Sequence, residues 1–363
     1  MPVELGEHSY EVMVGRGLLT RIAETLSTRC PASHYAVIAD SSVAPRYAEP
    51  VRAALAQAAR VTLLTFPAGE PHKNRETWST LTDQLLAAGL GRDGALVALG
   101  GGVTGDLVGF VAATYLRGIP YVQLPTTLLA MVDSSVGGKT GVDTSFGKNL
   151  IGAFHQPRVV VADVATLESL PRPHLVAGLA EVLKHAFIAD SEELDRLLLA
   201  RDQILRGNLD DLAGVISRSV GLKARVVAAD EREQGRRAIL NFGHTVAHAV
   251  EAVSGYSLIH GEAVAIGMAL ECEIGRRMGV TGATAAERVR SAIRSFELPD
   301  ALAPGIAADR LIEAMASDKK VRDRTIRFAL LKDIGEPARG PAGEWTLAAP
   351  IDVVRAVLTG GKK

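Results

Sequence analysis

Short runs of continuous apolar residues alternate with amphipathic segments in the first half of the chain, and this alternation ends near residue 170. Runs such as RVVVAD are typical of strands that are buried on both faces of a parallel sheet. The pattern predicts an α/β domain of the nucleotide-binding, Rossmann-like type. We expect strands at 35–39, 61–66, 95–99, 121–124 and 159–162, and helices at 50–59, 76–88 and 106–115.

The pattern of the sequence changes after Leu170, from alternating strands and helices to mainly helices. The segment SLPRPHL is a break signal, and leucine- and alanine-rich helical patterns follow it. We expect an α/β domain over 1–170 and a mainly α-helical domain over 171–363. The expected helices are 192–205, 209–229, 244–253, 262–278 and 285–295, and one further strand is expected at 326–331.

Composition narrows the class of protein. The 40 basic and 41 acidic residues nearly balance, so no global field favours nucleic acid or an anionic membrane. Cys30 and Cys272 match no metal or redox spacing, and the first residues lack the apolar core of a signal peptide. The apolar stretch 95–116 contains Asp106 and a glycine cluster, which favours a strand, a loop and a helix over a membrane span. We expect a cytoplasmic protein that acts on a small molecule.

Three polar loops follow strands of the predicted sheet. The sequence GGGVTGD at 100–106 follows one strand, and its glycines would let a backbone approach a pyrophosphate at a helix start. The alternative is a tight turn without a ligand, since the segment is not the GxGxxG fingerprint. Asp40 is placed to bond a ribose hydroxyl, and GEPHKN at 69–74 is the third loop. Together they favour dinucleotide binding.

The stretch VDSSVGGKTGVDTSFGKNLIG at 132–152 is rich in glycine, lysine, aspartate and hydroxyl residues. It has few large apolar side chains, so we expect it to form no core. Backbone amides and lysines in such a segment indicate a site for an anion.

Two helical segments carry candidate ligands. In GLAEVLKH, the residues Glu181, Lys184 and His185 share a helical face, and their apolar neighbours favour the interior over a solvated stripe. In NFGHTVAH, the HxxxH pair His244 and His248 indicates either zinc or a structural pair, and Thr245 departs from the zincin motif.

His260 begins a glycine-marked helix and favours the metal hypothesis, because a buried imidazole there needs a partner. Glu181, His244 and His260 then form a candidate His2Glu site with an open position. Lys223 and the charged run 230–237 are by themselves expected to be a solvated surface.

These segments, in this order, resemble the 3-dehydroquinate synthase family of the sugar phosphate cyclases. The similarity covers nearly the whole chain, including GGGVTGDLVGFVAATYLRG, LPTTLLAMVDSSVGGKTGVDTSFGKNLIGAFHQP, DERE, LNFGHTVAHAVE, HGEAVAIGM, DKK and IRFALL. The resemblance implies an N-terminal NAD-binding α/β domain and a C-terminal helical, metal-binding domain, with the active site between them.

The resemblance also implies roles for individual residues. A divalent metal, zinc or cobalt, would be held by Glu181, His244 and His260. His248 would then be a proton-transfer residue rather than a ligand, with Glu233 a second candidate and Lys139 also catalytic. NAD would contact Asp40, Glu70, Lys73, Gly101, Gly102, Val103, Asp106, Thr126, Thr127, Lys148, Thr166, Leu167, Glu168 and Ser169. Substrate would be held by Arg117, Asp133, Lys139, Asn149, Lys184, Lys223, Arg237, Asn241 and one of Lys319 and Lys320. Arg117 would reach the neighbouring subunit's site, which implies a homodimer.

The reaction implied by the resemblance converts 3-deoxy-D-arabino-heptulosonate 7-phosphate to 3-dehydroquinate and phosphate, a step of the shikimate pathway to aromatic amino acids. NAD oxidises a ring hydroxyl, phosphate is eliminated, the hydride returns, and an intramolecular aldol reaction closes the carbocycle.

Three alternatives remain. A polyol dehydrogenase of the glycerol dehydrogenase type has no use for the set of lysines and arginines, because its substrate offers no anionic group. A sister cyclase acting on a sugar phosphate without a carboxylate would not need Lys223 and Arg237, whereas an amino analogue of the substrate stays possible. A non-catalytic regulator would bind NAD and metal without turnover.

Overall fold

The computed structural model describes residues 1–255, 257–317 and 325–360. The chain forms two compact units, Met1–Leu170 with Leu212–Ala228, and Pro171–Asp211 with Ala229–Lys363. Helix α7 (Leu209–Ala229) thus groups mainly with the first unit, although the segments that flank it in sequence belong to the second. Spatial contacts rather than chain order define the units, so they are not two consecutive stretches of sequence.

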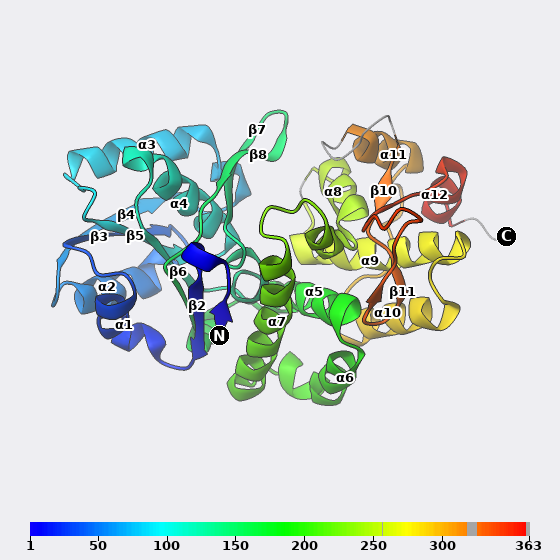
Figure 1. Cartoon of the computed structure of the whole chain (residues 1–363), viewed down its shortest axis with the longest axis horizontal. Helices are drawn as coiled ribbons and strands as arrows, with labels where there is room; N and C mark the ends of the chain where they lie inside the picture. Colours follow the sequence, from blue (N-terminus) through cyan, green and yellow to red (C-terminus); the bar gives the residue numbers. More distant parts are fainter. Residues whose placement is uncertain (256, 318–324, 361–363) are drawn as a thin grey trace. The chain divides into compact units, whose positions relative to one another are not determined.

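A seven-stranded sheet forms the middle of the first unit (Figure 1). Neighbouring strands are parallel, except that β1 is antiparallel to β2. Each of the five expected strands corresponds to one strand of the sheet. Strand β2 was missed because its residues alternate between buried and half-buried positions instead of forming a continuous apolar run. The spatial order is β1 (Pro2–Val3), β2 (Tyr10–Gly15), β9 (Val159–Asp163), β6 (Tyr121–Pro125), β5 (Ala95–Gly100), β3 (His34–Asp40) and β4 (Arg60–Phe66).

Helices cover both faces of this sheet, as Figure 1 shows. Ala36 and Ile38 of β3 belong to one core cluster, and Val37 and Ala39 belong to another. This alternation is the two-residue period of a strand that is buried on both faces. The first cluster includes residues of α3 (Arg75–Ala87) and α4 (Gly102–Thr114), and the second includes residues of α1 (Ile22–Arg29) and α2 (Ala44–Leu55).

Helix α2 begins six residues before the helix expected at 50–59, so Pro50 lies inside it rather than at its start. A proline inside a helix costs a backbone hydrogen bond. Here the buried residues Ala48, Val51 and Leu55 of the same helix face offset that cost by packing on the sheet.

The stretch 132–152 forms much of a hairpin of β7 (Lys139–Thr144) and β8 (Gly147–Phe154). The expectation that it contributes no core is wrong for Val142, which is fully buried in the cluster that α3 and α4 share. At the turn of the hairpin Phe146 is 92% exposed. Part of the segment therefore packs into the core, while the tip of the hairpin is exposed.

The second unit is mainly helical, as the sequence predicted. The strand expected at 326–331 is divided into two short strands because Ala329 and Leu330 do not continue the first pairing. The elements are α5 (Arg172–Ala189), α6 (Ser191–Leu205), α8 (His244–Val253), α9 (His260–Arg277), α10 (Ala283–Ser295), α11 (Ala308–Ser317), α12 (Ile351–Leu358), β10 (Arg327–Phe328) with β13 (Leu347–Ala348), and β11 (Leu331–Asp333) with β12 (Glu336–Pro337).

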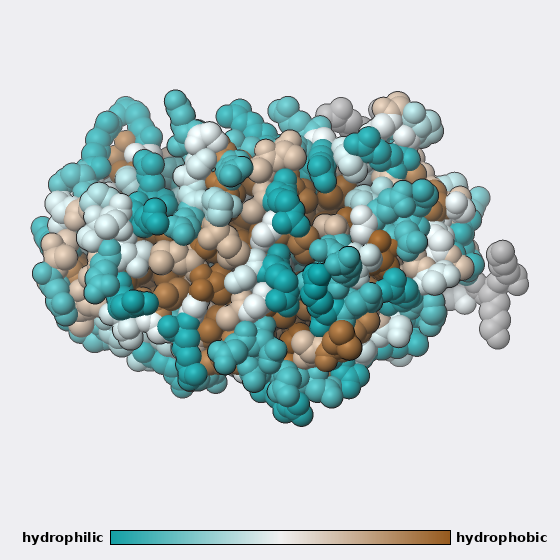
Figure 2. Space-filling view, turned by 60° about the horizontal axis from the view of Figure 1, so that its bottom comes forward, coloured by the Kyte–Doolittle hydropathy of each residue, from teal (hydrophilic) through white to brown (hydrophobic). Residues whose placement is uncertain are grey.

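Hydrophilic residues cover most of the face in Figure 2, and apolar residues form scattered patches on it. Across 1–255, 257–317 and 325–360, no helix has both the length and the apolar composition needed to cross a bilayer.

Candidate functional site

The parallel sheet of the first unit has a switch point between β3 and β5. The chain passes from β3 to β4 on one side, and the next strand, β5, pairs on the other side of β3. In open α/β sheets ligands bind outside the carboxyl ends of the strands at such a point. Asp40 ends β3 and Gly100 ends β5, so both of the first two predicted loops meet here.

The groups at this point suit a pyrophosphate and a ribose. Asp40 Oδ1 accepts from the N–H groups of Ser42 at 2.9 Å and Val43 at 3.2 Å, and its Oδ2 accepts from the Thr104 hydroxyl at 3.1 Å. The N-cap of α4 is Gly101, which has no side chain to cap the helix. The buried Ser134 hydroxyl has no hydrogen-bond partner among the described residues. These features fit an anion at the start of α4.

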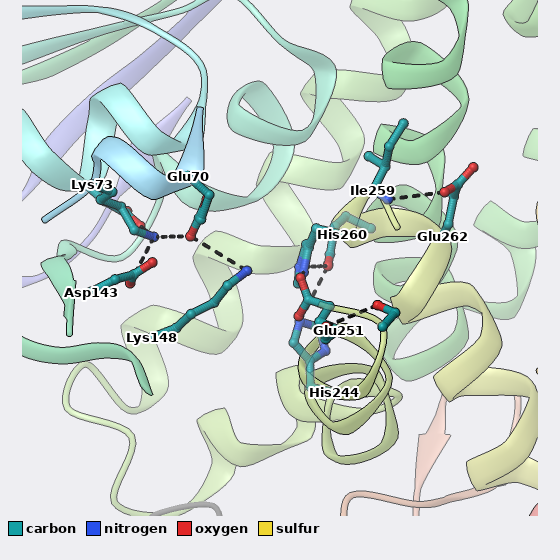
Figure 3. A network of polar contacts seen from close by, with 12 residues as sticks. Glu70, Lys73, Asp143, Lys148, His244, Glu251, Ile259, His260 and Glu262 are labelled. Atoms are coloured by element: carbon teal, nitrogen blue, oxygen red, sulfur yellow. Dashed lines mark hydrogen bonds and ion pairs between the residues drawn. The ribbon is translucent and has the colours of Figure 1, made fainter. Parts of the chain in front are cut away.

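A buried lysine cluster follows β4. Lys73 Nζ lies 2.8 Å from Glu70, 3.3 Å from Asp106 and 3.7 Å from Asp143 (Figure 3). Lys148 Nζ lies 3.7 Å from the same Glu70 carboxylate. Burial raises the pKa of Asp106 to about 6 although Lys73 opposes the shift. The sequence analysis missed Asp143, which stands in the GVD segment of the hairpin.

The turns after β6 and β9 carry the other predicted nucleotide contacts. The Thr126 N–H donates to the carbonyl of Gly100 at 2.9 Å, and the Thr127 hydroxyl accepts from the backbone of Ala130 at 3.2 Å. In the turn Val164–Ser169, Thr166 and Leu167 are buried. Glu168 is exposed and pairs with Arg16 at 3.1 Å, and Ser169 Oγ lies 2.6 Å from the Tyr47 hydroxyl. Gly102, Val103 and these turns all follow carboxyl ends of parallel strands.

Lys223 of α7 is buried, which overturns the expectation that it is solvated. Its Nζ donates to Asp133 at both Oδ1 and the carbonyl oxygen, each at 2.7 Å. A buried ammonium needs such partners.

Three other predicted substrate residues of this unit are exposed. They are Lys139 and Asn149 on the hairpin, and Arg117 in the turn after α4. The backbone of Arg117 has φ +69°, and that of Asn149 has φ +52°. Leu116 and Gly118 on either side of Arg117 have φ +49° and +112°. Successive left-handed residues are costly, and such strain is typical of functional turns.

Glu181, His244 and His260 come together in the second unit. Figure 3 labels the two histidines. Glu181 lies on α5 and is fully buried, while the two histidines begin α8 and α9. Glu181 Oε1 lies 3.5 Å from His244 Nε2 and 3.6 Å from His260 Nε2. Ligands of a tetrahedral zinc, with bonds of about 2.0–2.2 Å, lie about 3.4 Å apart. The donor set and its spacing therefore fit one divalent metal with an open position.

Glycines bring the three helices together. A Cβ on Gly261 would overlap the Ala177 carbonyl of α5, and a Cβ on Gly267 would overlap the Gly243 carbonyl at the start of α8. The helix backbones therefore touch, and residues on three separate segments converge.

The pKa values of the two imidazoles of the cluster are shifted in opposite directions. Burial lowers the pKa of His260, but hydrogen bonds to Glu181 and Glu251 outweigh burial and raise it to about 9. Burial and the positive charge of Lys184 hold the pKa of His244 well below its usual value.

Glu251 was missed by the sequence analysis. Its Oε1 lies 3.3 Å from His260 Nδ1, opposite the nitrogen that faces Glu181. The signal was available, because His244, His248 and Glu251 share one helical face at i, i+4 and i+7.

Two of the predicted proton-transfer and substrate residues, Lys184 and His248, contact this cluster. Lys184 is buried and forms an ion pair with Glu181, and His185 is buried on the same helix. The His248 ring stands edge-on to His244 with centroids 5.6 Å apart. Glu233 Oε1 accepts from the Asn241 amide at 2.6 Å.

Arg237 is buried and donates to the Glu231 carbonyl, so the expectation of a solvated loop at 230–237 is wrong for this residue. Asp230 shapes the loop by accepting from the N–H groups of Gln234, Gly235 and Arg237. Lys319 and Lys320 lie outside the described residues.

Comparison with known proteins gives the family. The model of the 3-dehydroquinate synthase N-terminal domain matches residues 63–177, and that of the C-terminal domain matches residues 178–321. The chain belongs to the 3-dehydroquinate synthase family. The resemblance inferred from its motifs is confirmed, and so is the fold class.

Curated relatives of the same family align along most of the chain. A 3-dehydroquinate synthase of Pelobacter propionicus is 48% identical over 338 residues, which are 93% of this chain and 94% of the relative. One of Symbiobacterium thermophilum is 48% identical over 337 residues, which are 92% of this chain and 94% of that protein.

Solved structures of sister cyclases are also similar. A 2-deoxy-scyllo-inosose synthase in complex with carbaglucose-6-phosphate, NAD+ and Co2+ is 26% identical, covers 100% of both chains and has a TM-score of 0.91. A 2-epi-5-epi-valiolone synthase from Streptomyces hygroscopicus with NAD+ and Zn2+ is 30% identical over 98% of both chains, with a TM-score of 0.87. A probable glycerol dehydrogenase from Sinorhizobium meliloti, at 18% identity and a TM-score of 0.68, shares the fold.

Proposed function

We propose that the protein catalyses the reaction of its family, the conversion of 3-deoxy-D-arabino-heptulosonate 7-phosphate to 3-dehydroquinate and phosphate. The observation that carries this proposal is the buried ion pair of Lys184 with the candidate metal ligand Glu181. A cation at that position suits an anionic substrate and has no use beside a neutral polyol. The buried Arg237 and Lys223 support the same conclusion.

The cofactors of the proposed reaction are NAD and a divalent metal, zinc or cobalt. We assign NAD to the carboxyl edge of the sheet in the first unit, and the metal to Glu181, His244 and His260. When bound, NAD would supply reversible hydride transfer and the metal would supply Lewis-acid polarisation of a substrate oxygen. The donor set of the metal cluster and the anion-suited start of α4 support these assignments.

The chain's own residues position the substrate and move protons. The lysines, Arg237 and the asparagines of the predicted set suit the phosphate and the carboxylate at the two ends of the substrate. His248 and Glu233 are assigned to proton transfer, since an imidazole and a carboxylate suit general acid–base catalysis and the His248 ring lies beside the candidate ligand His244. Asn241 orients Glu233 through the hydrogen bond at 2.6 Å.

One assay decides between the cyclase and its alternatives. Purified protein with zinc, NAD and the heptulosonate phosphate is followed for inorganic phosphate and NADH together. We expect phosphate release without net NADH, because the hydride returns in each cycle. Net NADH with glycerol would support a polyol dehydrogenase, and phosphate from glucose 6-phosphate alone would support a sister cyclase. Tight NAD and metal binding without turnover would indicate a regulator.

Lys139→Ala tests the role of the hairpin. We expect NAD affinity to stay within about twofold and phosphate release to fall at least about a hundredfold, since Lys139 is assigned to substrate. Unchanged turnover would overturn that assignment.

We also propose that the enzyme is a cytoplasmic homodimer in which Arg117 serves the neighbouring subunit's site. Arg117→Ala and Glu181→Ala are each expected to be inactive alone. In mixed dimers one site keeps both residues, so mixing the two variants should restore about a quarter of the wild-type activity. No recovery in mixtures that contain mixed dimers would contradict the shared site, and cell fractionation checks the location.

A further inference from the structure

A buried carboxylate that the proposed reaction does not use lies at the start of α8. Glu271, on α9, is fully buried. Its Oε2 accepts from the Gly243 N–H at 2.8 Å, and its Oε1 accepts from the Val246 N–H at 3.1 Å. Both oxygens of one side chain thus bind the backbone of another helix.

The two N–H groups belong to the first turn of α8. Gly243 is the N-cap of that helix, and Val246 is its third residue. These are N–H groups that no carbonyl within the helix can reach, and a side chain at the N-cap usually satisfies them. Gly243 has no such side chain, so the cap comes from α9 instead. A negative charge at this end also interacts favourably with the helix dipole.

The packing of α8 against α9 excludes a residue with a capping side chain at position 243. The backbone there has φ +83°, and an added Cβ would lie 2.5 Å from Met268 Cγ and 2.9 Å from the Met268 backbone nitrogen. The close contact of Gly267 with the Gly243 carbonyl holds the same backbone against α9. A remote carboxylate is therefore the means by which this turn can be capped.

The capped turn begins with a candidate metal ligand. His244 is the first residue of α8, directly after Gly243 and two residues before Val246. Its Nδ1 faces the Phe242 carbonyl at 3.3 Å, so its ring is also tied to the backbone of this turn. The direction of His244 Nε2 toward Glu181 hence depends on the backbone that Glu271 holds.

We propose that Glu271 is a positioning residue of the metal centre, which fixes His244 by capping the first turn of α8 from α9. The inference rests on the proposed metal site at Glu181, His244 and His260. It adds a residue that touches neither metal nor substrate. Residues that orient metal ligands from outside commonly change metal affinity 10- to 100-fold.

The test measures cobalt binding to the full-length chain by chelator competition, together with the visible absorption spectrum of the bound cobalt. Glu271→Gln keeps the size of the side chain, but its amide NH2 must face one of two N–H donors. We expect its cobalt affinity to fall about 10- to 100-fold and its spectrum to shift. Glu271→Asp keeps the charge but is one methylene shorter, so an intermediate loss is expected.

Glu273→Gln is the matched control. It removes a carboxylate two residues further along α9 that pairs with Arg276 and Arg277 instead of α8. We expect wild-type cobalt affinity and spectrum. Thermal unfolding of the metal-free proteins shows whether each variant folds. If Glu271→Gln does not fold, the test is made with Glu271→Asp.

Two negative outcomes are distinguishable. If wild type and Glu181→Ala bind cobalt equally, the proposed metal centre is wrong. If wild type binds at that centre and Glu271→Gln is less stable but keeps the wild-type affinity and spectrum, Glu271 has a structural role alone and the inference is overturned.

Discussion

The two units gather charged groups in opposite ways. In the first, one ammonium, Lys73, is surrounded by three carboxylates that lie between 2.8 and 3.7 Å from it. In the second, the carboxylate of Glu181 faces two imidazole nitrogens at 3.5 and 3.6 Å. In the first arrangement the lysine is the only cation that the carboxylates need, whereas in the second Glu181 pairs with Lys184 through Oε2 and its Oε1 and the two imidazole nitrogens form a three-donor set that suits a metal.

The two clusters are stabilised by different interactions. The lysine cluster is stabilised by the attraction of its own members, and these carboxylates raise the pKa of Lys73 despite burial. The histidine cluster depends on groups behind the ligands, namely Glu251 at His260 and Glu271 at the backbone before His244. Removal of single residues should therefore affect folding in one cluster and metal binding in the other.

The largest effect is expected from Glu181→Gln. The amide is a poor metal ligand, so the protein should lose its metal, and phosphate release should fall at least about a thousandfold. Elemental analysis measures the metal content. Retained NAD affinity would show that the first unit is intact, and full metal occupancy would contradict the ligand assignment.

Lys73→Met should mainly destabilise the first unit. It leaves Glu70, Asp106 and Asp143 close together without their cation, and loss of one partner of a buried ion pair costs about 3–5 kcal/mol. Urea unfolding measures the change, and metal content should stay at the wild-type level. Lys148→Met, which removes the longer contact to Glu70 at 3.7 Å, is the control. Equal losses in the two variants would mean that Lys73 is not the centre of the cluster.

Glu251→Gln should weaken metal binding without removing it. The carboxylate orients His260 through Nδ1, and loss of such a partner lowers metal affinity about 10- to 100-fold. Glu262→Gln is the control at the same helix start, because a glutamine oxygen can still accept from the Ile259 N–H as Glu262 does at 3.1 Å. Equal metal affinities of the two variants would contradict a role of Glu251 in metal binding.

The smallest effect is expected at Glu273, outside both clusters. Hydrogen bonds from Arg276 and Arg277 lower its pKa to about 2 from an ordinary value of 4.5. The folded state thus favours the ionised form, so the stabilisation is present above pH 4.5 and disappears as the pH falls toward 2. Glu273→Gln should cost less than about 1 kcal/mol at pH 7, with a smaller difference at pH 3. A difference that grows on acidification would reverse this sign.

Much of the secondary structure could be predicted from the sequence, because the pattern of residues within each strand or helix specifies it. The five expected strands are short, mainly apolar runs, and α7 and α8 have the predicted bounds because their residues follow an amphipathic helical pattern. Strand β2 and the core position of Val142 were missed, since their burial depends on distant elements.

The candidate metal ligands could be predicted from sequence motifs. The residues that pair with or position the charged groups of the site could not. Glu181, His244 and His260 were named from the sequence, and the structure brings them together. Asp143 and Glu271 had no such signal, because a carboxylate in the sequence does not reveal which lysine or backbone N–H it will face. Arg237 and Lys223 were expected in solvent for the same reason.

The α/β and helical parts, the family and the donor types of the candidate metal cluster could be read from the sequence, because periodicity and motif spacing are local properties of the chain. The tertiary structure decided which charges are buried, where α7 groups, and how α8 is capped. The physical reason is that burial and hydrogen bonding depend on close approach of segments far apart in sequence. At Gly243 and Gly267 that approach is set by the absence of a Cβ, and only packing shows what fills the space.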